Sequence, residues 1–152
     1  MRIFLATLGL AFSGAASACL VPPQDIHRAH DTLVSEATSI LLVKAISESS
    51  AGCSFQIVRV LKGRADASSI ACHLSASDDW MTDFNGHTAP YFWKQRMGRL
   101  GVSGSCSVMP PAFEVGHTYV LLLGVRPDTK QFEEVTPQDK WLLFIKHQLA
   151  GG

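Results

Sequence analysis

The sequence lacks three features, each of which would point to a large class of proteins: an excess of charge of one sign, a long apolar run, and a known catalytic motif. Thirteen Lys and Arg face 13 Asp and Glu, so charge gives no reason to expect binding to nucleic acid or an anionic membrane. No apolar stretch approaches the roughly 20 residues of a membrane-spanning helix. Nucleophile elbows, phosphate loops and metalloprotease helix motifs are missing. We therefore expect no enzymatic activity, no cofactor, no nucleic-acid partner and no membrane span.

The first 18 residues are typical of a secretory signal peptide. Arg2 supplies the positive start, residues 3–12 the apolar stretch, and Ala16-Ser17-Ala18 the cleavage site. Residues 19–152 are then the mature chain, which is long enough for one domain and is expected to be secreted or periplasmic. Lipid attachment at Cys19 is the alternative, although Ala16 stands where a lipoprotein signal usually has Leu.

Cysteine is scarce, with four residues at positions 19, 53, 72 and 106. In an exported protein an even number of cysteines indicates disulfides, here two. Counting alone leaves all three pairings open.

Residues of high strand propensity occur in short runs along the mature chain. Strands are predicted at 37–49, 53–63, 69–75, 117–125 and 131–136. In the second of these the alternation changes phase at Val58, which indicates a β-bulge.

Helices are predicted at both ends of this run of strands. Pro22 and Pro23 suit the first turn of a helix over about 23–34, and Thr136 is expected to cap a C-terminal helix with Pro137 in its first position. The C-terminal helix is apolar over most of its circumference and should pack on the sheet. Residues 76–116 lack periodicity and are expected to form a long insertion. Strands without alternating helices predict a mainly β fold, a small closed antiparallel barrel.

Four stretches, in this order, resemble the netrin-like module, the OB-type barrel shared by tissue inhibitors of metalloproteinases and many bacterial secreted proteins. They are "CLVPP" from 19, "EATSILLVKAI" from 36, "FQIVRVLKG" from 55 and "CSVMPPAFEVGHTYVLLLG" from 106. The resemblance implies a five-stranded OB-type antiparallel barrel with a short N-terminal helix and a C-terminal helix packed on it. It also implies an exported, disulfide-stabilised binding module.

The same resemblance implies a Cys19–Cys106 disulfide and leaves Cys53 and Cys72 to each other. With the turn near residues 65–67, Cys53 lies further from the turn than Cys72, so that bond would need a bulge or fold-back. On the arithmetic alone the other two pairings stay open.

In the inhibitors, the N-terminal segment forms a wedge whose terminal amine and carbonyl chelate the zinc of a protease. Here that segment would be Cys19, Leu20, Val21, Pro22 and Pro23, and its partner an unknown protein such as an extracellular or periplasmic metalloprotease. Pro23 matches the wedge. Val21 replaces the family's second cysteine, and Leu20 replaces a small hydroxyl residue.

Two other partner sites are open. Tyr91, Phe92 and Trp93 form either a plug over one end of the barrel or a recognition patch. As an alternative function, an OB barrel could bind a saccharide or other ligand on its strand face, where the nearby basic residues are Arg59, Lys62 and Arg64.

Two clusters could in principle ligate a metal ion. His27 and His30 are three residues apart on the predicted first helix, but no third ligand is spaced nearby, so solvent-facing histidines are expected. The acidic stretch at 77–87 has no closing Glu for a calcium loop and is expected to be a solvated loop. Its oxygen-bearing residues are Asp78, Asp79, Asp83 and Asn85.

Overall fold

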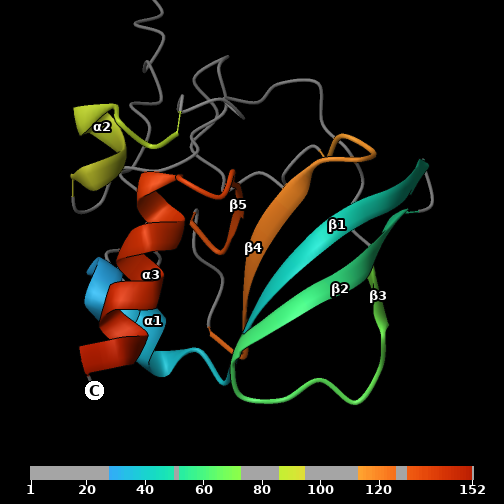
Figure 1. Cartoon of the computed structure of the whole chain (residues 1–152), viewed down its shortest axis with the longest axis horizontal. Coiled ribbons are helices and arrows are strands. Elements are labelled where there is room, and N and C mark those ends of the chain that lie inside the picture. The colour runs from blue at the N-terminus through green and yellow to red at the C-terminus, as the bar shows by residue number, and fades with distance from the viewer. Residues whose placement is uncertain (1–27, 50–51, 73–85, 95–112, 126–129, 152) are drawn as a thin grey trace, which may run out of the picture.

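The structure of the chain is a computed structural model that describes residues 28–49, 52–72, 86–94, 113–125 and 130–151. Within these ranges the chain forms three helices and five strands (Figure 1). In order they are α1 (His30–Glu36), β1 (Ser39–Ser49), β2 (Gly52–Lys62), β3 (Ser69–Cys72), α2 (Pro90–Trp93), β4 (Thr118–Leu123), β5 (Phe132–Glu134) and α3 (Lys140–Gly151). The predicted mainly β fold of five antiparallel strands, with a short N-terminal helix and a C-terminal helix, is confirmed.

The five strands form one sheet in the order β3-β2-β1-β4-β5, with every neighbouring pair antiparallel. The sheet is not closed into a barrel, so the prediction of closure was wrong for the described residues. Edge strands β3 and β5 have only 4 and 3 residues, which leaves little backbone for a closing ladder. The central strand β1 departs from regular register at three places along β2, and such bulges increase strand curvature.

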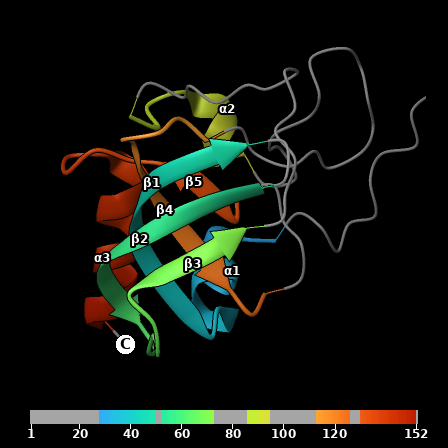
Figure 2. The ribbon, with the colours of Figure 1, turned by 90° about the vertical axis from the view of Figure 1, so that its right-hand side faces the viewer.

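Alternation along the central strands divides the apolar side chains between the two faces of the sheet. Ile40, Val120 and Leu122 pack against the helices, together with Trp141 and Ile145 of α3. The opposite face has its own core, built around the rings of Phe55, Phe113 and Tyr119 with the β1 residues Leu41, Val43 and Ala45. Figure 2 shows the sheet in front of α3 and α1, which cover one face. Both faces of β1 are therefore buried, as its aliphatic sequence predicts.

Both terminal helices begin later than the sequence predicts. α1 starts at His30, since Ala29 has an extended ψ of 145°, and the proline pair expected to start it lies outside the described residues. α3 starts at Lys140 rather than at Pro137. The reason is Asp139, whose carboxylate accepts hydrogen bonds from the backbone N–H groups of Trp141 at 2.8 Å and Leu142 at 3.3 Å. This is an N-cap, so Asp139 and not Thr136 sets the start of the helix.

The remaining element bounds differ from the predictions by a few residues. β3 and β5 are shorter than predicted, and α2 lies inside the stretch expected to be an insertion. The predicted bulge in β2 is confirmed, because Ile57 pairs with Val43 and Arg59 pairs with Leu42, leaving Val58 as the extra residue.

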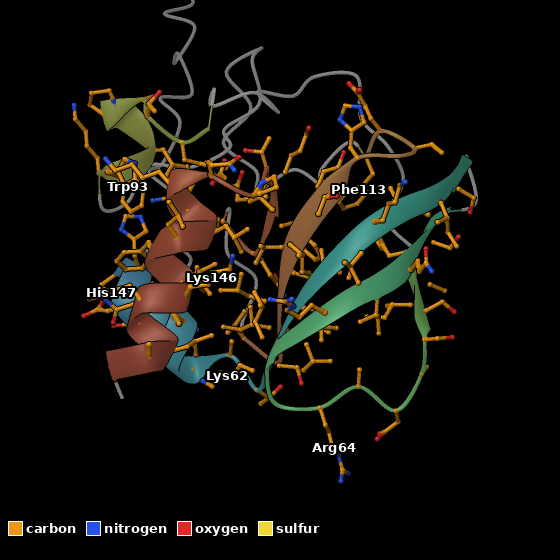
Figure 3. All side chains as sticks on the ribbon, viewed as in Figure 1. Lys62, Arg64, Trp93, Phe113, Lys146 and His147 are labelled. Atoms are coloured by element: carbon orange, nitrogen blue, oxygen red, sulfur yellow. The ribbon has the colours of Figure 1, made fainter. Side chains whose placement is uncertain are left out.

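The end of β2 is fixed to α1 by a charged side chain. The Lys62 ammonium donates to the carbonyl oxygens of Val34 at 3.0 Å and Ser35 at 2.7 Å (labelled in Figure 3). A cation at the C-terminal end of a helix satisfies exposed carbonyls and opposes the helix dipole. The next residue, Gly63, has φ of +72°, and a Cβ there would lie 2.3 Å from the Thr38 carbonyl oxygen. "LKG" is thus a structural junction.

Candidate functional site

An open cleft lies between the helix-facing side of the sheet and α3. Its volume is about 360 Å³, at the lower end of the roughly 300–1,000 Å³ typical of small-molecule sites. We name it the outer cleft, and define it by its described lining residues: Leu42, Val58, Arg59, Thr118, Val135, Thr136, Pro137, Leu142 and Lys146.

The floor of the outer cleft is apolar. Val135 and Leu142 are buried and belong to the core between sheet and helices, and Leu42 of β1 packs against the same core. Val58, by contrast, is 56% exposed, which is high for a valine beside such a core. The bulge in β2 explains its position, because the extra residue is displaced from the regular ladder. The cleft thus presents apolar surface that no described residue covers.

The rim of the outer cleft is cationic. Arg59 comes from β2, directly opposite Leu42, and Lys146 comes from α3. Figure 3 shows Lys146 on the side of α3 that faces the sheet, whereas His147 lies on the other side. Among the described lining residues there is no carboxylate, and Thr118 and Thr136 add hydroxyl groups. The electrostatic field at the rim therefore favours a negatively charged group.

Residues 135–137 form one wall of the outer cleft. The residues that flank this wall in sequence contact a buried histidine. His87 Nδ1 lies 2.8 and 2.9 Å from the two carboxylate oxygens of Asp139, and its Nε2 lies 3.1 Å from Glu133 Oε2. The side chains of His87, Glu133 and Asp139 are 3%, 0% and 2% exposed. Because Glu133 and Asp139 flank the wall in sequence, His87 fixes both of its ends. We call these three residues the His87 clamp.

The chemistry of the His87 clamp favours a charged imidazole. Carboxylates only accept hydrogen bonds, so both ring nitrogens can donate only when the ring is protonated. Burial by itself lowers the pKa of His87, but the hydrogen bonds and charges of Asp139 and Glu133 outweigh it, and the pKa is raised above its ordinary value. The clamp is thus a buried ion pair in which one cation serves two anions.

Backbone geometry shows that His87 is held in place at a conformational cost. Its φ is 57°, in the left-handed region that few non-glycine residues adopt. Such a conformation costs on the order of 1–3 kcal/mol and persists where the surroundings impose it. Here Trp93 Nε1 donates to the His87 carbonyl at 2.7 Å, and the Phe92 ring lies 4.3 Å from the imidazole.

A second buried basic side chain also lies near Phe92. Lys130 is 3% exposed, its ammonium lies 4.9 Å from the Phe92 ring centroid, and it is 2.7 Å from His30 Nε2. An ammonium has only donors, so His30 Nε2 is the acceptor of this hydrogen bond. His30 is also in contact with Trp141 at 5.5 Å between ring centroids. The expectation of a solvent-facing His30 was wrong, because its ring packs against aromatic side chains of the core.

The aromatic residues at 91–93 lie in different environments. Phe92 is fully buried against Trp141, Trp93 is half-buried with Lys140 4.9 Å above its ring, and the side chain of Tyr91 lies outside the described part. Phe92 is thus a core residue rather than part of a contact surface. Trp93 is the member whose described surface a partner could reach.

The other predicted site residues fall largely outside the described residues. These are Cys19, Leu20, Val21, Pro22, Pro23, His27, Asp78, Asp79, Asp83, Asn85 and Cys106. Cys53 is buried, and in the register of β2 and β3 it is the direct Cα partner of Cys72. No bulge or fold-back is needed to oppose these two residues, contrary to the sequence-based expectation.

Sequence reasoning missed the His87 clamp and the outer cleft. The sequence predicts a solvated loop that ends at His87 and a short strand that contains Glu133. A positive signal existed in "NGH", a turn sequence ending in a residue that tolerates the left-handed region. The carboxylates lie 46 and 52 residues away, so nothing local indicated them.

No protein-family model, curated protein or solved structure matches this chain. Within the described ranges, no three His, Cys, Asp or Glu side chains are grouped so as to hold a metal ion. Nor does any helix in those ranges combine the length and apolar character needed to cross a bilayer.

Proposed function

We propose that this chain is an exported, disulfide-stabilised binding domain of the netrin-like type, without catalytic activity, which binds its ligand in the outer cleft. The observation that carries the proposal is the outer cleft itself, with an apolar floor left uncovered by the described residues and a rim of two cations. Small-molecule sites combine apolar walls with a few placed polar groups in this way.

Strand order supports the OB-type assignment. Sheet order β3-β2-β1-β4-β5 would become a five-stranded Greek-key barrel if β3 met β5, and OB folds are commonly partly open. β1 has the central place, pairing with β2 on one side and β4 on the other. Its bulges supply the curvature that such a barrel needs.

The "FEVGHTY" stretch supports the same assignment through its contacts. Phe113 packs in the sheet core against Tyr119, whose hydroxyl accepts a hydrogen bond from the Glu114 backbone N–H at 2.8 Å. Gly116 has φ of +92° and its N–H donates to the Ala45 carbonyl at 2.8 Å. The spacing Phe-x-x-Gly-x-x-Tyr is thus explained by one turn that enters β4.

The register of β2 and β3 supports the proposed Cys53–Cys72 disulfide. Directly opposed residues of antiparallel strands have Cα atoms about 4.5–5.5 Å apart, within the range that a disulfide spans. Cys19–Cys106 remains a proposal from the resemblance alone.

The absence of catalysis is proposed because the sequence carries no known catalytic motif, and the His87 clamp adds that this buried histidine is not a free base. Both imidazole nitrogens face carboxylates at 3.1 Å or less, so the ring has no free nitrogen with which to activate a nucleophile.

A fragment screen tests the proposed function. Backbone amide spectra of the ¹⁵N-labelled mature protein are recorded with several hundred small organic fragments of mixed charge. We expect hits whose shift changes cluster at residues 58–59, 118, 135–137, 142 and 146. Hits confined to other surfaces, or none at all, would show that the outer cleft is not a ligand site.

A further inference from the structure

We propose that the outer cleft binds a small organic monoanion that carries an unbranched apolar chain, with a carboxylate as its charged group. This rests on the proposed function and specifies the ligand of the same site.

The charge of the ligand follows from the two rim cations. In the described part of the chain, neither Arg59 nor Lys146 forms an ion pair or a side-chain hydrogen bond. Two other basic residues at the end of β2 are engaged: Lys62 caps α1, and Arg64 lies 3.7 Å from Asp66. Two uncompensated cations on opposite walls of one cleft attract an anion and repel metal ions and amines.

The single charge and the carboxylate follow from the rest of the lining. Apart from the two cations, the described polar lining consists of the hydroxyl-bearing Thr118 and Thr136, which are suited to hydrogen bonding a carboxylate. A dianion with its charges at opposite ends of the chain would leave one of them over the apolar floor, where desolvation without a partner is costly. Arg59 is suited to a planar two-oxygen group, because its guanidinium can donate two parallel hydrogen bonds to a carboxylate.

The apolar chain follows from the floor. Val58 is 56% exposed and lies beside Leu42, Val135 and Leu142. Covering this surface with a hydrocarbon chain would remove apolar area of both partners from water. A cleft of about 360 Å³ is too small for a folded partner and has room for a small ligand with a hydrocarbon chain.

Calorimetric titration of the mature protein, residues 19–152, with sodium octanoate tests the inference. We expect octanoate to bind with a Kd of roughly 0.1–1 mM, as expected for a ligand of this size. Octanol, with the same chain and no charge, should bind about five-fold more weakly, and octylammonium should not bind. Butyrate, with the charge and a short chain, should also bind more weakly than octanoate.

Three variants assign the effect to its residues. Arg59→Gln and Lys146→Gln should each weaken octanoate about five-fold, and the double variant more. Arg64→Gln is the matched control: its side chain is 88% exposed and points away from the body of the domain in Figure 3, so affinity should not change. Because the substituted side chains are exposed, each variant should fold. Amide spectra verify this.

The outcomes separate the two proposals. If octanoate fails to bind, or binds the double variant as well as the parent, the ligand class is wrong. Equal binding of octylammonium would also overturn it. When fragments nevertheless map to the outer cleft, the proposed function stands without this ligand. When neither fragments nor octanoate reach the cleft, both proposals fail.

Discussion

Replacing His87 by glutamine tests the buried ion pair that holds the wall of the outer cleft. Glutamine can still donate hydrogen bonds but carries no charge, so two carboxylates that are 0% and 2% exposed lose their shared cation. Removing one partner of a buried ion pair costs about 3–5 kcal/mol. Since glutamine retains part of the hydrogen bonding, we expect a loss of about 3 kcal/mol in the free energy of unfolding. Against a total of roughly 5–15 kcal/mol, that is a large fraction.

The pH dependence gives this prediction a definite sign. The pKa of His87 is raised in the folded protein, so its charge contributes fully below the ordinary histidine pKa of about 6.5. That contribution is lost as pH rises through the higher folded value. The difference in stability between parent and His87→Gln should therefore be larger at pH 5.5 than at pH 9.

Urea unfolding followed by tryptophan fluorescence measures both effects, because Trp93 and Trp141 lie near the clamp. His117→Gln is the matched control. His117 also lies between two carboxylates, at 2.8 Å from Glu134 and 3.3 Å from Glu114, but its side chain is 44% exposed. It should change stability by no more than about 0.5 kcal/mol. If His87→Gln is no more destabilising than His117→Gln, or its effect grows as pH rises, the reasoning about the clamp is refuted.

Two further substitutions and one peptide map test the junctions around the sheet. Lys62→Met should destabilise the domain by about 1–2 kcal/mol in the same urea assay, because two carbonyls at the end of α1 lose their donor; an unchanged midpoint would contradict this. Gly124→Ala should cost more than 1–2 kcal/mol, since φ is +74° and the new Cβ would lie 2.0 Å from Thr38 Oγ1; a neutral effect would argue against the close approach. Peptide mapping without reduction should recover Cys53 linked to Cys72, and recovery of either residue joined to another cysteine would argue against the register of β2 and β3.

Local patterns predicted the strands well because strand propensity and alternation act within a few residues. The bulge at Val58 could be read from the change of phase, and the buried central strand from its aliphatic run. Helix starts were less predictable. Thr136 and Asp139 are both good caps by residue type, and only the structure shows that the backbone N–H groups of Trp141 and Leu142 donate to Asp139.

The candidate site depended on contacts that sequence patterns do not carry. The outer cleft joins residues from β1, β2, β4 and α3, and the His87 clamp joins residues 46 and 52 positions apart. Arg59 could be noted as part of a basic cluster near the second strand. Only the tertiary structure shows that Lys62 caps α1 and that Arg59 stays uncompensated among the described residues.

The central claim is that the outer cleft is a ligand site, and the most direct test is to locate a ligand there. Crystals of the mature protein soaked with 8-bromooctanoate would place the bromine by anomalous scattering. We predict a bromine peak over the floor formed by Leu42, Val58 and Leu142, with the carboxylate toward Arg59 and Lys146. A cleft without bromine, in crystals where the cleft is open to solvent and bromine is bound elsewhere on the protein, would contradict the account.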